Sequence, residues 1–443
     1  MELKAFYAET PVRRLFFTAA LPGSVSMLAS SLYYLIDGIL VGNLLGDTAF
    51  AAVNLALPLV YINFALADLI GVGSAVPISI SLGRRDYAAA NNAFSAACLL
   101  ILLTGVLMGG TFYLFAPQLI ALMGAEGALA ESAVSYLRVY ALCSPVTTIV
   151  FAMDNYLRIC GRVRMSMVLN ILMSALCAVC EFVFLGVLHL DVWAAALANS
   201  IGMAVCVALA LYPFARGRMQ LRFVRPRFTA ALLGRIAACG SPSFLNNIAG
   251  RLTAIVMNSL LLSLGGEEAV SVYGVMMYAE SLILPVMYGV CDSLQPAVSY
   301  NLGAGLHGRV RGIERWCFAA CALVSLLSAA VMLAFPVETA VLFVGSDSAG
   351  VLAMSETAVR LYALTFLTRW VSFACQSYLS ALGQALPAAV ISVSVAMLFP
   401  VAFIALFGPL GLTGIWLNSS ATALCAGALA AWLLSRRVKT ALT

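Results

Sequence analysis

Charged residues are scarce in this sequence. Asp, Glu, Lys and Arg together make up 10% of its 443 residues, whereas hydrophobic residues make up 63%. Soluble domains carry about 25% charged residues, so the composition excludes a soluble chain. Apolar runs of about twenty residues, long enough to cross a bilayer as helices, recur from end to end. The sequence therefore predicts an all-α polytopic membrane protein.

Histidine is nearly absent, and the cysteines follow no structural pattern. The 2 histidines, His189 and His307, argue against a His-based metal site and against a membrane enzyme. The 12 cysteines lie mostly in apolar stretches, without the spacing of a disulfide framework. Cys177 and Cys180 form a C-x-x-C that has no companion pair, so we assign this pair to packing. We expect no metal and no cofactor, and the net charge of +5 comes from loop residues rather than a nucleic-acid surface.

The apolar runs divide into twelve expected membrane spans. Their ranges are 15–41, 51–82, 91–115, 131–157, 165–188, 192–214, 233–264, 271–302, 315–336, 352–380, 386–407 and 412–434. Of the 24 Lys and Arg residues, all but Arg138, Arg251, Arg360 and Arg369 lie before the first span or around the loops that follow even-numbered spans. By the positive-inside rule, this predicts a multi-pass protein of the cytoplasmic (inner) membrane with both termini cytoplasmic.

The two halves of the chain repeat each other around a basic segment, residues 215–235. Residues of the first half recur in the second at a nearly constant offset: Pro22 with Pro242, Gly83 with Gly303, Tyr140 with Tyr362, Gly161 with Gly383, and Asn199 with Asn418. Six spans per half make the repeats parallel. We predict an N-terminal six-helix bundle over 1–214, a cytoplasmic linker over 215–235 and a C-terminal six-helix bundle over 236–443. Such folds bind substrate between the halves and work by alternating access.

The first span carries one carboxylate, Asp37, at the end of a polar stripe. The stripe is Ser26, Ser30, Tyr33 and Asp37, whose spacing places them on one helix face. A charge inside a bilayer is costly and seldom serves packing, so an intramembrane Asp is a candidate functional residue. The alternative is that Asp37 ends the helix at the level of the lipid headgroups.

Several motifs along the chain resemble one transporter family. They are Pro22, Asp37-Gly38 and Val41-Gly42 in the first span, Arg158-Ile-Cys-Gly161 after the fourth, Ala194 to Asn199 in the sixth, and Gln295-Pro-Ala-Val-Ser-Tyr-Asn301-Leu-Gly303 in the eighth. With these motifs the chain resembles the bacterial members of the multidrug and toxic compound extrusion (MATE) family over essentially its full length. The loop 82–91 lacks the G-x-x-x-D-R-x-G-R-R pattern of the major facilitator superfamily, which shares this outline.

The resemblance implies a coupling-ion site in the N-terminal bundle. Family members typically carry an Asn and an Asp on the fifth span and a Thr on the sixth, and these positions are Cys177, Glu181 and Asn199 here. Because Cys177 replaces a hard oxygen ligand, the site favours a proton over sodium. Two carboxyl groups close together in a low dielectric allow one of them to hold a proton at neutral pH. Tyr33 and Asp37 complete the predicted site. The alternative is that Glu181 lies at the level of the lipid headgroups, near the end of the fifth span, and has no part in coupling.

Pro22 lies about four helical turns below Asp37. Proline removes a backbone hydrogen bond and weakens the helix there, so we expect a bend in the first span. The resemblance implies that this bend responds to the charge of Asp37. A static kink is the alternative.

Three charged residues lie well inside the second half: Arg251, Glu280 and Arg369. They lie about 15 to 22 Å from the outer ends of their spans, so contact is possible. One interpretation is a structural pair of Glu280 with one Arg, with the other Arg satisfied elsewhere. The other is a cationic spot in the cavity, which would favour substrates that carry a carboxylate or a phosphate.

The sequence as a whole predicts a cation-coupled antiporter, with H⁺ favoured over Na⁺, that exports amphipathic organic compounds or drugs by alternating access. Abundant Met, Phe and Tyr residues suit an adaptable apolar cavity. The alternatives are a lipid or glycolipid flippase and an integral-membrane enzyme. We expect a small-molecule substrate and the lipid bilayer as partners, and a monomer.

Overall fold

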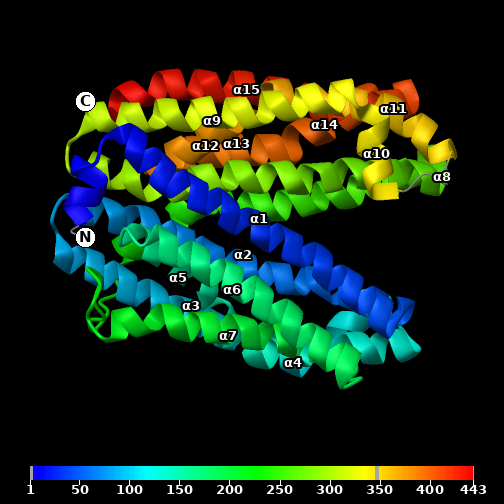
Figure 1. Cartoon of the computed structure of the whole chain (residues 1–443), viewed down its shortest axis with the longest axis horizontal. Helices are drawn as coiled ribbons and strands as arrows, with labels where there is room; N and C mark the ends of the chain where they lie inside the picture. Colours follow the sequence, from blue (N-terminus) through cyan, green and yellow to red (C-terminus); the bar gives the residue numbers. More distant parts are fainter. Residues whose placement is uncertain (1–2, 345–348, 443) are drawn as a thin grey trace. The chain divides into compact units, whose positions relative to one another are not determined.

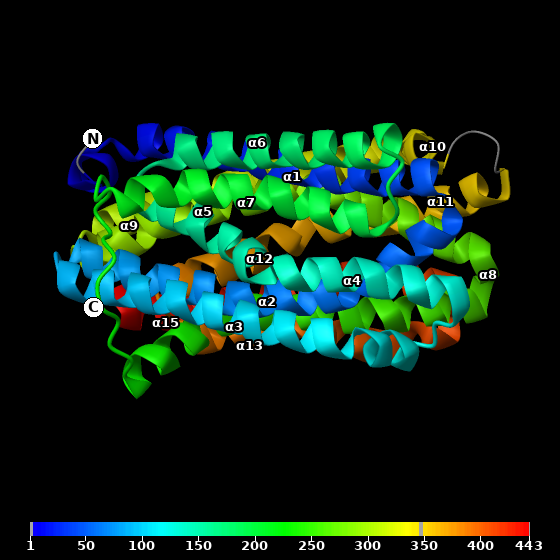
Figure 2. The same ribbon diagram turned by 90° about the horizontal axis from the view of Figure 1, so that it is seen from below.

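The computed structural model describes residues 3–344 and 349–442, which form helices joined mostly by short turns (Figures 1 and 2). The long connection is the irregular segment 216–229 between the two halves, within the predicted linker 215–235. The first half contains η1 (Ala5–Glu9), α1 (Val12–Leu45), α2 (Asp47–Gly83), α3 (Tyr87–Leu122), α4 (Gly127–Thr147), α5 (Ile149–Ile159), α6 (Val163–Glu181), η2 (Phe182–Val187) and α7 (Trp193–Ala215). The second half contains α8 (Ala230–Gly303), α9 (His307–Ala334), α10 (Pro336–Val344), α11 (Ala349–Ala363), α12 (Thr365–Ala381), α13 (Ala385–Val393), η3 (Ser394–Leu398), α14 (Phe399–Phe407), η4 (Gly408–Leu410) and α15 (Gly411–Leu442).

Every expected span corresponds to a helix in the described part of the chain. By length and composition, 9 helices there can cross a membrane, and the number is 10 if α11 and α12, bent by 42° at their junction, count as one span. Two of these helical stretches, 230–303 and 385–436, hold two spans each. The first turns at Gly266 and the second at Gly411, both with a φ of 64°. This left-handed backbone conformation suits glycine, which has no Cβ to clash.

The connections differ from the predicted ones in two places. The loop expected at 265–270 is a break at the single residue Gly266, after which the helix continues. The loop expected at 337–351 begins with a further helix, α10 (Pro336–Val344). At nine residues α10 is too short to cross a bilayer, so it lacks the long apolar run that marks a span in the sequence.

The described helices form two compact units. The N-terminal unit comprises Met1–Glu9 and Val25–Gly240, and the C-terminal unit comprises Thr10–Ser24 and Ser241–Thr443. The beginning of α1 therefore belongs to the C-terminal unit, and the beginning of α8 belongs to the N-terminal unit. The predicted bundles, 1–214 and 236–443, did not include this exchange. Both exchange points lie within three residues of a repeat-related proline, Pro22 or Pro242.

Close contacts between backbones hold the exchanged segments. In the N-terminal unit, a Cβ on Gly240 of α8 would lie 1.9 Å from the carbonyl oxygen of Leu69 on α2. In the C-terminal unit, a Cβ on Gly289 of α8 would lie 2.3 Å from the Cα atom of Ser24 on α1. Backbone atoms cannot rotate aside as a side chain can, so both crossings require glycine.

We expect Gly240→Ala to destabilise the protein by about 1–3 kcal/mol, because the added methyl group forces α8 and α2 apart. The measurement is the midpoint of thermal unfolding in detergent. Gly234→Ala is a matched control on the same helix, where an added Cβ meets nothing within 4 Å. Equal unfolding midpoints for the two variants would contradict the close crossing.

Candidate functional site

A cluster of polar side chains joins α1 to α7 inside the N-terminal unit. The Tyr33 hydroxyl donates to Asp37 Oδ1 at 3.2 Å and also to Asn199 Oδ1. The Asn199 amide nitrogen donates to Asp37 Oδ1 at 3.0 Å. Asp37, the expected functional carboxylate of the first span, thus lies in a hydrogen-bonded cluster within the unit.

Glu181 adds a second carboxyl group to this cluster. It is the last residue of α6, its exposed fraction is 0%, and its carboxyl group interacts with Asp37 and Tyr33. Neither carboxyl oxygen has a hydrogen bond of normal geometry to the described residues. The helix changes to the π-helical turn η2 directly after Glu181, and such turns often occur at functional sites. The structure therefore brings together the two carboxyl groups that the sequence assigned to the coupling site.

Close packing of α6 against α7 places the remaining predicted residue, Cys177. A Cβ on Gly202 of α7 would lie 2.4 Å from the Cys177 sulfur, so glycine allows this approach. The Cys177 thiol donates to the backbone carbonyl of Asn199 at 3.5 Å. Cys177 thus contacts the backbone of α7 beside the carboxyl groups.

A second polar network joins α5 to α6 and α1, and its ion pair was not predicted. Asp154 of α5 forms an ion pair with Arg158, with 2.5 Å between Oδ2 and Nη2, and it accepts a hydrogen bond from Asn170 of α6 at 2.8 Å. Asn170 also donates to Ser26 of α1 at 2.8 Å. Asp154 lies within the fourth expected span, so it is an intramembrane carboxylate of the same kind as Asp37 and could have been predicted from the sequence.

Arg158 is buried, although its position after the fourth expected span predicted a loop residue. Its exposed fraction is 0%, and its backbone carbonyl accepts a hydrogen bond from Tyr7. Burial raises the pKa of Tyr7 above its ordinary value, so this hydroxyl stays protonated and able to donate. Local sequence shows that Arg158 ends a helix, but it does not show that the N-terminal segment covers it.

We expect Asp154→Ala to destabilise the protein by about 3–5 kcal/mol, because it leaves the buried Arg158 without its counter-ion. The measurement is unfolding by denaturing detergent in mixed micelles. Glu356→Ala is the matched control, because Glu356 and Arg360 form a pair with the same spacing whose side chains are 46% and 56% exposed. The control should cost about 0–1 kcal/mol. Equal losses would show that burial of Arg158 carries no penalty.

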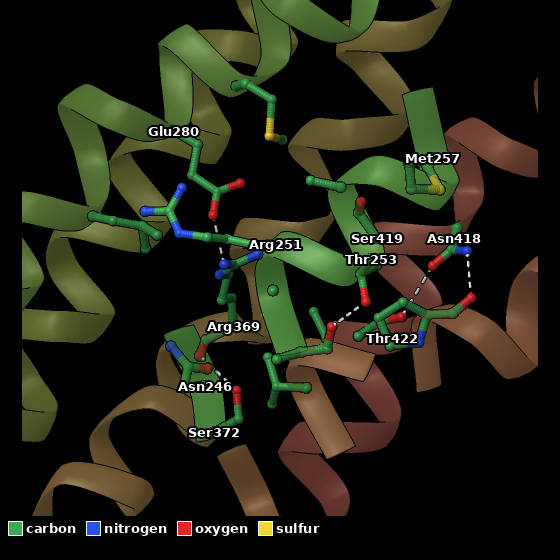
Figure 3. A pocket seen from close by; sticks show the side chains of 18 of the residues that line it. Asn246, Arg251, Thr253, Met257, Glu280, Arg369, Ser372, Asn418, Ser419 and Thr422 are labelled. Atoms are coloured by element: carbon green, nitrogen blue, oxygen red, sulfur yellow. Dashed lines mark hydrogen bonds and ion pairs between the residues drawn. The ribbon is translucent and has the colours of Figure 1, made fainter. Parts of the chain in front are cut away.

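The three charged residues predicted for the second half line one pocket of the C-terminal unit (Figure 3). Arg369 of α12 forms an ion pair with Glu280 of α8, with 2.5 Å between Nη2 and Oε1. Tyr362 of α11 donates to the other oxygen of Glu280. Arg251 of α8 lines the same pocket, whose volume is about 340 Å³. Sequence reasoning found the three charges but missed Tyr362.

Pro22 lies inside α1, which continues through it as an α-helix. The C-terminal unit includes α1 up to Ser24. The predicted bend site therefore lies two residues before the point where α1 passes from one unit to the other.

The MatE family model matches residues 22–183 and 242–406. This chain belongs to the MatE family. The model matches each half once, as an internal repeat requires, and each match begins at one of the paired prolines, Pro22 or Pro242. Family membership makes the chain a membrane transporter and not an enzyme.

Relatives and solved structures agree with the MatE assignment. The chain is 26% identical to "Multidrug export protein MepA" of Staphylococcus saprophyticus, over 95% of this chain and 93% of that protein. A crystal structure of MATE in complex with MaL6 has a TM-score of 0.93 and 22% identity, and covers 99% of this chain and 98% of that one. An outward-facing multidrug resistance MATE family transporter of the MOP superfamily has a TM-score of 0.90 and 23% identity, with 96% of each chain covered. These two structures confirm the predicted fold class.

Proposed function

We propose that this chain is a proton-coupled antiporter that exports amphipathic organic compounds by alternating access. The observation that carries the proposal is the cluster of Asp37 and Glu181 with Tyr33 and Asn199 in the N-terminal unit. Carboxyl groups inside a membrane serve as proton relays in pumps and transporters. The similarity to a multidrug export protein over nearly the full length supports export of organic compounds.

The composition of the site supports a proton over sodium. Asp37 Oδ1 already accepts hydrogen bonds from Tyr33 and Asn199. One turn before Glu181, the side chain offered by α6 is the thiol of Cys177, and hard cations prefer oxygen ligands. Two neighbouring carboxyl groups can share one proton without any further ligand.

The basic loops support an orientation in the cytoplasmic (inner) membrane with both termini cytoplasmic. In this orientation, a proton entering down its gradient would drive an organic compound out. We propose that the protein does this as a monomer in the lipid bilayer.

Reconstitution into proteoliposomes tests this function. Uptake of an amphipathic dye is followed under a pH gradient alone and under a sodium gradient alone. The proposal requires uptake with the pH gradient and none with the sodium gradient. The reverse result would assign sodium as the coupling ion, and movement of a fluorescent phospholipid in place of the dye would indicate a flippase.

Pro22 is proposed as the bend that responds to Asp37, because it lies beside the passage of α1 between the units. Pro22→Ala restores a backbone hydrogen bond donor and stiffens the helix. We expect slower dye transport with an altered dependence on pH, measured in the same vesicles. Pro58→Ala, in the interior of α2, is the control. Normal transport by Pro22→Ala with an unchanged pH profile would leave the proline a purely structural role.

A further inference from the structure

We infer that the pocket of the C-terminal unit binds an oxyanion, the carboxylate or phosphate group of an amphipathic substrate. This inference rests on the proposed export function and specifies the class of compound exported. The pocket is formed entirely by residues of the C-terminal unit, on α8, α11, α12, η3, α14 and α15. Its volume of about 340 Å³ falls within the range of small-molecule sites.

Two guanidinium groups share this pocket with one carboxylate. Among the described residues that line it, Arg251 and Arg369 are the cations and Glu280 is the one anion. Each oxygen of Glu280 accepts a hydrogen bond, one from Arg369 and one from Tyr362. The side chains of Arg369 and Glu280 remain 23% and 15% exposed. The pair therefore faces open space rather than solid core, and the lining keeps a net charge of one positive unit.

The form of these cations suits an oxyanion. A guanidinium group offers a planar fork of N–H donors that matches carboxylate and phosphate oxygens. A concave site lined by a net charge also concentrates its field and attracts ligands of the opposite sign. Figure 3 shows Arg251, Arg369 and Glu280 toward one side of the pocket and Asn418 and Thr422 toward the other. The charged groups therefore occupy one end of the site.

The rest of the lining suits the body of an amphipathic molecule. Uncharged polar groups come from Asn246, Thr253, Ser372, Asn418, Ser419 and Thr422. Flexible apolar side chains come from Met257, Met277 and Leu284. Methionine adapts its shape to varied apolar ligands. The lining thus combines one cationic end with adaptable apolar surface.

The internal repeat relates this pocket to the carboxyl cluster of the first half. Pairing Pro22 with Pro242 places Tyr33 opposite Thr253 and Asp37 opposite Met257, and Asn199 pairs with Asn418. Thr253, Met257 and Asn418 all line the pocket. The pocket is therefore the counterpart, in the second repeat, of the carboxyl cluster in the first. Met257 stands in the second repeat where Asp37 stands in the first. The net charge of the residues that line the pocket is positive.

Binding of a matched pair of dyes to the purified protein tests the inference. One dye is a xanthene that carries a free carboxylate, and the other is the methyl ester of the same dye. Affinity is measured by fluorescence anisotropy in nanodiscs of neutral lipid, with no ion gradient. We expect the carboxylate dye to bind more tightly, and Arg251→Gln to weaken that dye about tenfold without affecting the ester.

Three further variants make the result specific. Arg369→Gln should act as Arg251→Gln does, and Glu280→Gln should strengthen carboxylate binding because it removes the one anion. Arg360→Gln, on the exposed face of α11, is the control and should bind both dyes as the unmodified protein does. Thermal unfolding confirms that each variant is folded.

The inference fails if dye and ester bind equally, or if Arg251→Gln weakens both to the same extent. It also fails if Glu280→Gln weakens carboxylate binding as the Arg variants do, because the cluster would then be structural. Displacement of the carboxylate dye by added anionic phospholipid would support the oxyanion site and assign lipid phosphate as its occupant. Intact carboxylate binding without gradient-driven export would overturn the proposed function alone. Equal binding with working export would overturn this inference alone.

Discussion

Replacement of Asp37 by Asn is expected to reduce dye transport driven by a pH gradient to the rate of protein-free vesicles. Asn has nearly the same size, and its side-chain oxygen can still accept hydrogen bonds from Tyr33 and Asn199. It cannot take up and release a proton near neutral pH. The variant should therefore insert and fold normally but lose coupling, as measured by dye uptake and by thermal unfolding.

Asp47→Asn is the matched control for this experiment. Asp47 lies in the exposed first turn of α2, just beyond the end of α1, and carries the same functional group. Its replacement should leave transport unchanged. Transport by Asp37→Asn at the rate of the unmodified protein would remove the basis of the proposed coupling site.

The helices could be predicted from the sequence because a bilayer imposes a simple rule. Each span needs about twenty apolar residues, and the scarcity of charge made the runs easy to delimit. The exchange of the first parts of α1 and α8 between units could not be predicted in this way. It depends on backbone contacts such as that of Gly240 with Leu69, which involve residues distant in sequence and leave no periodic pattern.

The candidate coupling site was only partly accessible from the sequence. Helical spacing placed Tyr33 and Asp37 on one face, and their hydrogen bond agrees with that spacing. Glu181 and Asn199 were selected through the family resemblance, because no local pattern links α6 and α7 to α1. Arg158 was misassigned, since a basic residue next to a turn resembles an exposed loop charge until its neighbours are known.

The pocket of the second half shows the same limit. Depth along the spans indicated that Arg251, Glu280 and Arg369 could meet, and the structure places all three on one pocket. Depth alone could not show which Arg pairs with Glu280, because that depends on the rotation of each helix. Tyr362 was known only as the repeat partner of Tyr140, which gave no sign of its hydrogen bond to Glu280.

Replacement of Glu181 by Gln is expected to abolish coupling as well. Glu181 is fully buried, and its carboxyl group interacts with Asp37 and Tyr33. Gln preserves the size of the side chain but cannot exchange a proton. If the two carboxyl groups hold the coupling proton jointly, loss of either should stop transport. The direct measurement is proton release when dye binds to the purified protein in weakly buffered detergent solution. We expect release from the unmodified protein and none from Glu181→Gln.

Glu181→Asp separates the carboxyl group from the length of the side chain. It restores an acid that is one methylene shorter, which is the residue that the family resemblance implies at this position. We expect proton release and transport to be retained, at a reduced rate because the shorter side chain stands further from Asp37. If Glu181→Gln transports normally while Asp37→Asn does not, Asp37 alone carries the proton and Glu181 is not part of the coupling site. If both Glu181 variants fail equally, the site requires both the carboxyl group and the full length of the Glu side chain, because Gln keeps only the length and Asp keeps only the acid.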